Sequence, residues 1–490
     1  MTGEAVATPR LPAWATPLGC ALIVLVVTLP RIVFAARFGL IGDEAYYAIW
    51  SFHPSFGYYD HSPSVAWVIW LGRAIFGEGE FAVRSLFLVS GLAVSALLYR
   101  IGELLFADRR IGAAAAIAYA VTPGIIITFT VATPDGPSTL CWSLTIWAVA
   151  EFLRSRNANW WLLAGAFAGF GLLSKYTVVF LGAGLLVYLV TKRERLQWLK
   201  LWQVWAGGLI AIVMFAPVIW INSQRDWNSF RFQLGRSTLE AHHFAGPYEF
   251  TRFLVEESIQ LLPTLFVFLV IGIVLFFARR AKPLALPLLT SAPMVGYFLV
   301  HAVFGRVNPN WTAPLFPQLA LIGAWAVIAV RPSRAWLRWP LDLLKYLHVP
   351  LGLLVIGLAY FAIDARALPF IGRLSAFDYV YGWDNLQRKV SDLAAANGAQ
   401  WVDAQDYSLN GWLGYYGRMA NDPLPVVQTT QSYRYAYLPP MDEALRRAPH
   451  LIVRNPGADP TPPKGARSLG IVTRDYDGDK LAGYQVFLAP

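Results

Sequence analysis

Charge is scarce in this chain of 490 residues. Asp, Glu, Lys and Arg make up only 14% of it, whereas hydrophobic residues make up 56%. A wholly soluble protein is excluded, because it would need far more charge to cover its surface. Only two cysteines occur, Cys20 and Cys141, and both fall in apolar segments. A disulfide framework is therefore excluded, and both are expected to be small core residues. A Walker-type phosphate-binding loop is also missing, which argues against an ATP-driven machine.

Long hydrophobic runs fill most of the first 363 residues. A membrane-spanning helix needs roughly 20 apolar residues. We therefore predict an α-helical polytopic membrane protein with about eleven transmembrane helices. The first run is too long for a cleavable signal peptide and is followed by no small-residue cleavage site, so we expect it to remain as a helix. The candidate spans are residues 17–37, 81–106, 111–131, 137–153, 159–174, 176–190, 203–222, 258–278, 284–303, 312–330 and 342–363.

Basic residues give the chain a net charge of +10 and fall mainly in short linkers between the spans. If the N-terminus is cytoplasmic, five alternate linkers face the cytoplasm and all of them are basic, which is the positive-inside pattern. This topology explains the charge better than nucleic-acid binding does, so no nucleic acid is expected as a partner. The five linkers contain Arg109 and Arg110; Arg154 and Arg156; Lys192, Arg193, Arg195 and Lys200; Arg279, Arg280 and Lys282; and Arg331, Arg334 and Arg338.

The linkers on the opposite side contain the polar and charged residues that could take part in catalysis or substrate binding. They are residues 38–80, 132–136, a turn at Lys175, 223–257 and 304–311. After residue 364, Gly, Pro, Asp and Asn punctuate short apolar runs, which predicts a small soluble α/β domain outside the cytoplasm. The predicted domains are a transmembrane domain, 1–364, with an outer loop at 38–80, and a C-terminal domain, 365–490. The C-terminal domain carries no motif that indicates whether it covers a site, binds a substrate or packs on the outer loops.

Three carboxylates stand out on this outer side. Asp43 and Glu44 directly follow the first span, where two adjacent carboxylates cost energy unless they are hydrated, paired or used. They either cap a surface helix in a solvated loop or take part in chemistry. Asp135 lies in a Pro-Asp-Gly-Pro sequence, which favours a turn. It has either a purely structural role or a role in the same site as Asp43.

Lys175 stands alone between two apolar runs, where a charge is expensive at membrane depth. We prefer a tight hairpin turning at Lys175 to one long helix, because about thirty residues are too many for a single crossing. The lysine either extends its side chain to the membrane interface or provides a cation that binds a phosphate held at membrane level.

Two further clusters are rich in His and Tyr. The first contains Tyr58, Tyr59, Asp60 and His61, in which the tyrosines are either interfacial anchors or substrate contacts. The second is the pair His242 and His243. One of these histidines could ligate a divalent metal together with Asp60, or both are plain loop residues.

Four short segments carry a resemblance to a known family. They are Asp43-Glu44 with Tyr46-Tyr47; residues 57–63; residues 133–137; and Leu172-Leu173-Ser174-Lys175. In order, spacing and sidedness they resemble the bacterial GT-C glycosyltransferases related to the dolichyl-phosphate-mannose protein mannosyltransferases and to the aminoarabinose transferase of lipid A (ArnT-like). The resemblance covers roughly residues 17–330. Such enzymes transfer a sugar from a polyprenyl-phosphate carrier, outside the cytoplasm, to a lipid, glycan or protein acceptor.

The resemblance implies a role for each matching residue. Asp43 would act at the acceptor hydroxyl, and Lys175 would bind the carrier phosphate. Asp60 and His61 match an acidic–basic pair whose second member is Lys in the aminoarabinose transferase, so His61 is a departure. The full expected set is Asp43, Glu44 and Asp135 as catalytic residues; Lys175 and His61, with Arg231, Arg236 or Arg252, at the donor phosphate; Tyr46, Tyr58 and Tyr59 at the substrate; and Asp60, His242 and His243 at a metal.

The expected partners are a polyprenyl-phosphate-linked sugar, a lipid or glycan acceptor and membrane lipids. The favoured acceptor is lipid A, lipopolysaccharide or another envelope glycan, with protein as an alternative, and the reaction would invert the anomeric centre. A divalent metal ion, Zn or Mg, in the outer-loop site is the one candidate cofactor, and the sequence does not establish that any cofactor is required. The expected location is the bacterial cytoplasmic (inner) membrane, with the site facing the periplasm. The alternatives are a transporter or flippase, disfavoured because the polar residues lie in loops rather than mid-helix, and a non-catalytic accessory protein.

Overall fold

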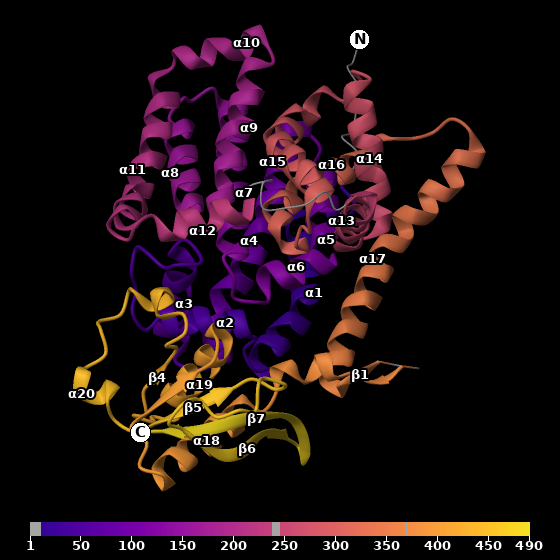
Figure 1. Ribbon diagram of the computed structural model, residues 1–490. Helices are drawn as coiled ribbons and strands as arrows, with labels where there is room; N and C mark the ends of the chain where they lie inside the picture. Colours follow the sequence, from indigo (N-terminus) through magenta and orange to yellow (C-terminus); the bar gives the residue numbers. More distant parts are fainter. Residues whose placement is uncertain (1–10, 238–245, 369–370) are drawn as a thin grey trace, which may run out of the picture.

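A computed structural model describes residues 11–237, 246–368 and 371–490. A large helical bundle occupies one end of the molecule, and a smaller domain built on a β-sheet occupies the other (Figure 1). The predicted fold class, a polytopic helical protein with a C-terminal α/β domain, is confirmed.

The helices follow the hydrophobic runs of the sequence, and every predicted span overlaps at least one of them. Three pairs are bent at short breaks: α5–α6 by 74°, α13–α14 by 108°, and α9 against the α10 segment by 116°. The helices up to the C-terminal domain are α1 (Pro17–Arg37), α2 (Gly42–Trp50), α3 (Ser64–Phe76), α4 (Glu80–Phe106), α5 (Arg109–Ala120), α6 (Pro123–Phe129), α7 (Asp135–Ser155), α8 (Trp160–Leu172), α9 (Val179–Val190), α10 (Arg193–Leu196), α11 (Trp202–Gln224), α12 (Asn228–Ser237), α13 (Gly246–Leu261), α14 (Pro263–Phe277), α15 (Ala285–Phe304), α16 (Phe316–Ala329) and α17 (Ala335–Ala365).

Judged by helix length and composition, fewer helical segments could cross a membrane than the sequence predicts. Six helical segments of the described chain are long and apolar enough to cross a membrane, or up to nine if each bent pair is one span. One predicted span, α8, has only 13 residues, although it is apolar. The predicted count of about eleven is therefore not confirmed.

The outer loop between α1 and α4 folds into two helices, α2 and α3. Glu44 caps α2, because its Oε2 accepts a hydrogen bond from the Ile41 backbone N–H at 3.1 Å. The same carboxylate forms a two-pronged ion pair with Arg84 of α4, at 2.7 and 2.5 Å, and accepts from the Ala132 backbone N–H at 2.8 Å. Both side chains of the ion pair are completely buried. Glu44 therefore ties three segments of the chain together.

Replacement of Glu44 by Gln is expected to destabilise the protein by about 3–5 kcal/mol, because the Arg84 charge would be left buried without its partner. The matched control is Glu443→Gln, which removes exposed ion pairs with Arg446 and Arg447 and should cost no more than about 1 kcal/mol. Thermal unfolding in the same detergent measures both effects. Equal stability of the two variants would contradict the structural role of Glu44.

The C-terminal domain is built on a five-stranded sheet with the strand order β4-β3-β5-β7-β6. Strand β3 is parallel to both β4 and β5, whereas β7 is antiparallel to β5 and β6. The bounds are α18 (Trp383–Ala396), β3 (Trp401–Ala404), α19 (Tyr407–Met419), β4 (Val426–Val427), α20 (Glu443–Arg446), β5 (His450–Arg454), β6 (Arg467–Tyr476) and β7 (Asp479–Ala489), preceded by a small β1 (Ala367–Leu368) and β2 (Gly372–Arg373) hairpin.

Helix α19 joins this domain to the outer loop. Its Trp412 donates through Nε1 to the Leu40 carbonyl oxygen at 2.7 Å, and the hydroxyl of its Tyr416 accepts from the Leu40 backbone N–H at 3.0 Å. Buried side chains of α2, α3 and the sheet form one continuous hydrophobic core. The basic linker at α10 lies at the far end of the bundle from this domain (Figure 1). The outer loop and the C-terminal domain thus fold as one layer over one end of the bundle.

Candidate functional site

A cavity of about 760 Å³ lies where the bundle, the α2–α3 loop and the C-terminal domain meet. All five linkers that the sequence assigns to the outer side contribute to its lining, through residues such as Asp43, Asp135, Lys175, Gln233 and Asn308. Part of its wall is apolar and includes side chains of α9 and α15. The cavity therefore combines polar and charged side chains with a wall suited to hydrocarbon.

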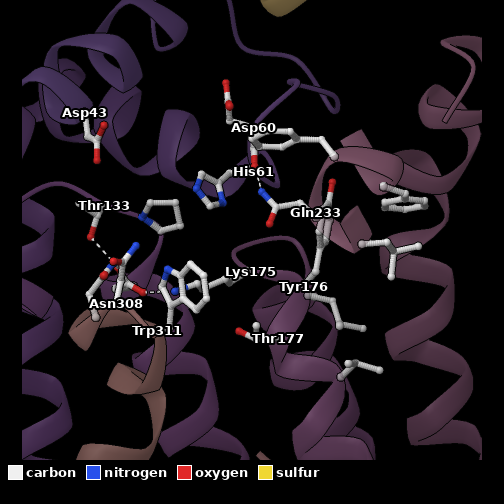
Figure 2. Close-up of a pocket in the computed structure, with 18 of the residues that line it drawn as sticks. Asp43, Asp60, His61, Thr133, Lys175, Tyr176, Thr177, Gln233, Asn308 and Trp311 are labelled. Atoms are coloured by element: carbon white, nitrogen blue, oxygen red, sulfur yellow. Dashed lines mark hydrogen bonds and ion pairs between the residues drawn. The ribbon is translucent and has the colours of Figure 1, made fainter. Parts of the chain in front are cut away.

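Asp43 lies in the first turn of α2 and projects toward this cavity (Figure 2). Its Oδ1 accepts a hydrogen bond from the hydroxyl of Tyr407, at the start of α19, at 3.1 Å. Burial raises the pKa of the Asp43 carboxyl above its ordinary value, whereas the hydrogen bond from Tyr407 opposes this shift. A carboxylate with a raised pKa is a better proton acceptor, which suits a general base.

Lys175 and Asp135 form a buried ion pair, with Nζ and Oδ1 2.5 Å apart. Asp135 is held in turn by Asn310, whose Nδ2 donates to its Oδ2 at 2.8 Å. Figure 2 shows Lys175 approaching the cavity from the bundle, whereas Asp43 approaches from the outer loop. The lysine is a compact cation in the wall of the cavity, where it can bind a phosphate while its ion pair with Asp135 is kept.

The position of Lys175 follows from a break in the helix, as predicted. Helix α8 ends at Leu172, Lys175 has extended backbone angles (φ −152°, ψ 133°), and a 3-10 turn leads into α9. Ser64, at the start of α3, fixes the break: its backbone N–H donates to the Leu173 carbonyl at 2.9 Å and its hydroxyl donates to that of Ser174 at 2.7 Å. These bonds satisfy polar groups that the end of a helix leaves open.

Asp60 is bound on three sides. Its carboxylate pairs with Arg434 of the C-terminal domain and accepts a hydrogen bond from the Tyr46 hydroxyl at 2.8 Å. Its backbone carbonyl accepts a hydrogen bond from the Gln233 amide (Figure 2). The Arg434 guanidinium also lies 5.0 Å from the ring centre of Tyr407. Asp60 therefore anchors the C-terminal domain to the outer loop at the edge of the cavity.

The charges of the cavity wall sort into two ion pairs and one remaining carboxylate. Asp135 pairs with Lys175, and Asp60 pairs with Arg434. Within the described part of the chain, Asp43 has no cationic partner. It is thus the carboxylate of this wall that is available to accept a proton.

Several residues that the sequence assigns to the site do not line this cavity, and three of them, Glu44, Tyr58 and Arg252, have other partners. Glu44 is occupied by Arg84, as described above, so its surroundings give it a stabilising role and do not support the expected catalytic one. Tyr58 stacks on Trp50 at 4.1 Å, and its hydroxyl donates to the His53 carbonyl, so it is a structural residue. Arg252 pairs with Glu249 and Glu256 along its own helix, α13, and does not reach the cavity as a phosphate ligand.

Of the remaining expected residues, Tyr46 and His61 line the cavity, whereas Tyr59 lies outside it, against Phe232 and Tyr433. Arg231 is exposed on α12 and is not part of the lining. His242 and His243, and the side chain of Arg236, lie outside the described residues.

The described residues provide no set of ligands for the metal site expected at Asp60. Among them, no group of three or more His, Cys, Asp and Glu side chains is arranged to hold an ion. Arg434 occupies the Asp60 carboxylate, and a guanidinium cannot be displaced by deprotonation near neutral pH.

The C-terminal domain supplies two residues that sequence reasoning missed, Tyr407 and Arg434. They lie 364 and 374 positions from their partners Asp43 and Asp60, in a region without a readable motif. Asn308 and Asn310 were also missed. Their only signal was a short polar sequence, Asn-Pro-Asn, in a linker already assigned to the outer side.

Comparisons with known proteins identify a family model, a relative and solved structures that are similar to this chain. Residues 60–221 match the family model of the dolichyl-phosphate-mannose-protein mannosyltransferases. The chain is 24% identical over 350 residues to the lipid A galacturonosyltransferase RgtD of Rhizobium johnstonii, covering 66% of this chain and 67% of that protein.

Two solved structures share the fold. ArnT from Cupriavidus metallidurans bound to undecaprenyl phosphate superposes with a TM-score of 0.63 at 14% identity, covering 95% of this chain and 97% of ArnT. The oligosaccharyltransferase of Archaeoglobus fulgidus does so with a TM-score of 0.54 at 13% identity, covering 91% of this chain and 70% of that one. By its family match over residues 60–221, its relative and its fold, the chain is similar to the GT-C membrane glycosyltransferases, and its fold resembles that of ArnT.

Proposed function

We propose that this glycosyltransferase moves a sugar from a polyprenyl-phosphate carrier to a hydroxyl group of lipid A or a related envelope glycan, on the outer face of the bacterial inner membrane. The observation that carries the proposal is the placement of an unpaired carboxylate, Asp43, and a buried cation, Lys175, in one cavity that also has an apolar wall. The named substrates of similar proteins support it, since RgtD acts on lipid A and ArnT has been solved with undecaprenyl phosphate.

The proposed reaction is a single displacement. Asp43 accepts the proton of the acceptor hydroxyl as its oxygen forms a bond to C1 of the sugar. The bond between C1 and the phosphate oxygen breaks, and its electron pair leaves with the carrier phosphate. Lys175 stabilises the negative charge that develops there. Attack opposite to the leaving group inverts the anomeric centre.

The apolar wall provides a place for the carrier chain. Leu172, Val179, Phe180 and Phe298 line the cavity next to Lys175. Val179 is 61% exposed, so this wall continues onto the surface of the bundle, where lipid would be expected. A prenyl chain lying there would bring its phosphate to Lys175 from the membrane, without any nucleotide-binding loop.

The direct test is transfer by the purified full-length chain in lipid nanodiscs. Polyprenyl-phosphate galacturonic acid is the first donor to try, because RgtD transfers that sugar, and neutral and amino sugars follow. Lipid A is the acceptor, and mass spectrometry detects the added sugar. Parallel reactions with EDTA test a metal requirement through His242 and His243. Failure to transfer any of these sugars, in a preparation that binds the donor, would overturn the proposal.

The pH dependence of this reaction should report on Asp43. The base works only when it is deprotonated, so activity should fall as the pH falls through its raised pKa. The Tyr407 hydroxyl lowers that pKa by donating to the carboxylate, so Tyr407→Phe should move the acidic limb to higher pH. At a pH on this limb we expect roughly fivefold less activity than wild type, since one hydrogen bond is worth about 1 kcal/mol, with the plateau at high pH within about threefold.

Initial rates between pH 4 and 9 measure this displacement. Tyr476→Phe, at a partly exposed position on β6, is the matched control and should leave the profile unchanged. A limb that stays in place or moves to lower pH in Tyr407→Phe would contradict the assignment of the limb to Asp43.

A further inference from the structure

A second, smaller cavity of about 200 Å³ lies beside the main one. It is formed by the end of α11 and the start of α12, by the Gly57–Tyr59 stretch of the outer loop and by a segment of the C-terminal domain around Arg434. Asn228 and Ser229 add an amide and a hydroxyl to its wall. The cavity is large enough for a small polar group but not for a sugar chain.

Two arginines and no carboxylate line this second cavity within the described residues. One is Arg434. The other, Arg225, is half-buried and donates from Nη1 to the Gly57 carbonyl oxygen at 2.8 Å. In the described part of the chain Arg225 forms no ion pair with an acidic residue. A half-buried guanidinium held by one neutral carbonyl retains most of its five N–H donors and its full charge for another partner.

A single layer of side chains separates the two cavities. Arg434 lines both of them. Tyr176, in the wall of the main cavity, shares a 3.0 Å hydrogen bond with Ser229, in the wall of the second. Arg434 also lies over the ring of Tyr407, whose hydroxyl reaches Asp43. The second cavity therefore adjoins the main one at two places: at Arg434, which is linked through Tyr407 to Asp43, and at Tyr176, which directly follows Lys175.

We propose that this second cavity binds a phosphate group carried by the acceptor lipid. The inference rests on the proposed function, because it assigns the Asp43 side of the site to the acceptor and the Lys175 side to the donor phosphate. An arginine fork matches phosphate geometry, and such charge-assisted hydrogen bonds are stronger than neutral ones. Arg225 supplies the unpaired charge, and Arg434, which is already paired with Asp60, can add N–H donors. A phosphate held there would orient the acceptor so that a nearby sugar hydroxyl faces Asp43.

Arg225→Gln tests the proposal, because this residue lies outside the main cavity and should leave the chemistry intact. The probes are lipid A carrying its phosphates and the same lipid A after enzymatic dephosphorylation. The matched control is Arg231→Gln, which removes an exposed arginine that lines neither cavity. Full-length wild type and variants are compared in nanodiscs of zwitterionic lipid. Transfer gives KM for acceptor and donor separately, and binding of each lipid A is also measured without any donor.

We expect Arg225→Gln to raise the acceptor KM for phosphorylated lipid A about tenfold, as loss of one charge-assisted contact predicts. The donor KM and the kcat should stay within about twofold, and dephosphorylated lipid A should not distinguish the variant from wild type. An unchanged acceptor KM, or a raised donor KM instead, would overturn the proposal. The binding measurements separate the two proposals. If no sugar is transferred, but wild type binds phosphorylated lipid A selectively and Arg225→Gln loses that selectivity, only the transferase proposal is refuted. If wild type binds both forms of lipid A equally well, only the proposal of a phosphate site in the second cavity is refuted.

Discussion

Asp43→Asn is expected to lower the kcat of sugar transfer by about a thousandfold while leaving the KM for the polyprenyl-phosphate donor within about threefold. General-base catalysis by a positioned side chain contributes roughly 10²–10⁴-fold to a rate. The amide has the shape of the carboxylate and can still accept the hydrogen bond of Tyr407, so the fold of α2 against α19 should survive. It cannot accept the acceptor proton, which is why the loss should fall on kcat.

Steady-state rates with saturating lipid A, and donor binding measured separately, provide the check. Asp384→Asn is the matched control, because it makes the same exchange in the first turn of α18 at a side chain that is 65% exposed. Wild-type turnover by Asp43→Asn would show that the base is another group. If cells lose the envelope sugar on deletion of the chain but keep it with Asp43→Asn, transport or an accessory role becomes the better explanation.

Lys175→Met is expected to lower kcat/KM for the donor by about 10²–10³-fold, because a single preorganised group that stabilises developing charge is worth that much. The side-chain length is nearly kept, so the apolar part of the contact remains. The same change leaves Asp135 buried without its cation, which should also destabilise the fold. Activity alone therefore cannot separate a phosphate ligand from a structural ion pair.

The double variant Lys175→Met with Asp135→Asn makes that separation. It removes both charges, keeps an amide for Asn310 to contact, and should recover thermal stability relative to the single variant. If Lys175 binds the carrier phosphate, donor kcat/KM stays low in the double variant. Recovery of activity along with stability would show that Lys175 serves only to neutralise Asp135.

The linkers and motifs of the sequence pointed to three residues that the structure brings together, and the reason is local. A run of apolar residues long enough to cross a bilayer predicts a helix wherever it occurs, and the positive-inside pattern then sorts the linkers by side. Asp43, Asp135 and Lys175 lie in three linkers assigned to the same side, and the structure brings them to one cavity. Even the break at Lys175 was predictable, because a single helix through residues 159–190 would be too long.

Other features depended on contacts that no local pattern records. The sequence treats Asp43 and Glu44 alike, yet Glu44 pairs with buried Arg84 and only Asp43 faces the cavity. The count of crossings was uncertain for another reason: the bends at α5–α6 and α13–α14 fall directly before Pro123 and Pro263, and hydropathy alone does not register them.

The sequence by itself determined that this is a polytopic helical protein, with basic linkers on one side and linkers rich in carboxylates, histidines and aromatic residues on the other. The reason is that the free energy of placing apolar and charged residues relative to a membrane depends on each segment alone. Only the tertiary structure decided which carboxylate stays unpaired, and that Tyr407 and Arg434 complete the site from a domain more than 360 positions away. Pairing of charges depends on distances of a few ångströms between segments that are remote in sequence. Those distances are fixed only when α19 and the outer loop share one hydrophobic core.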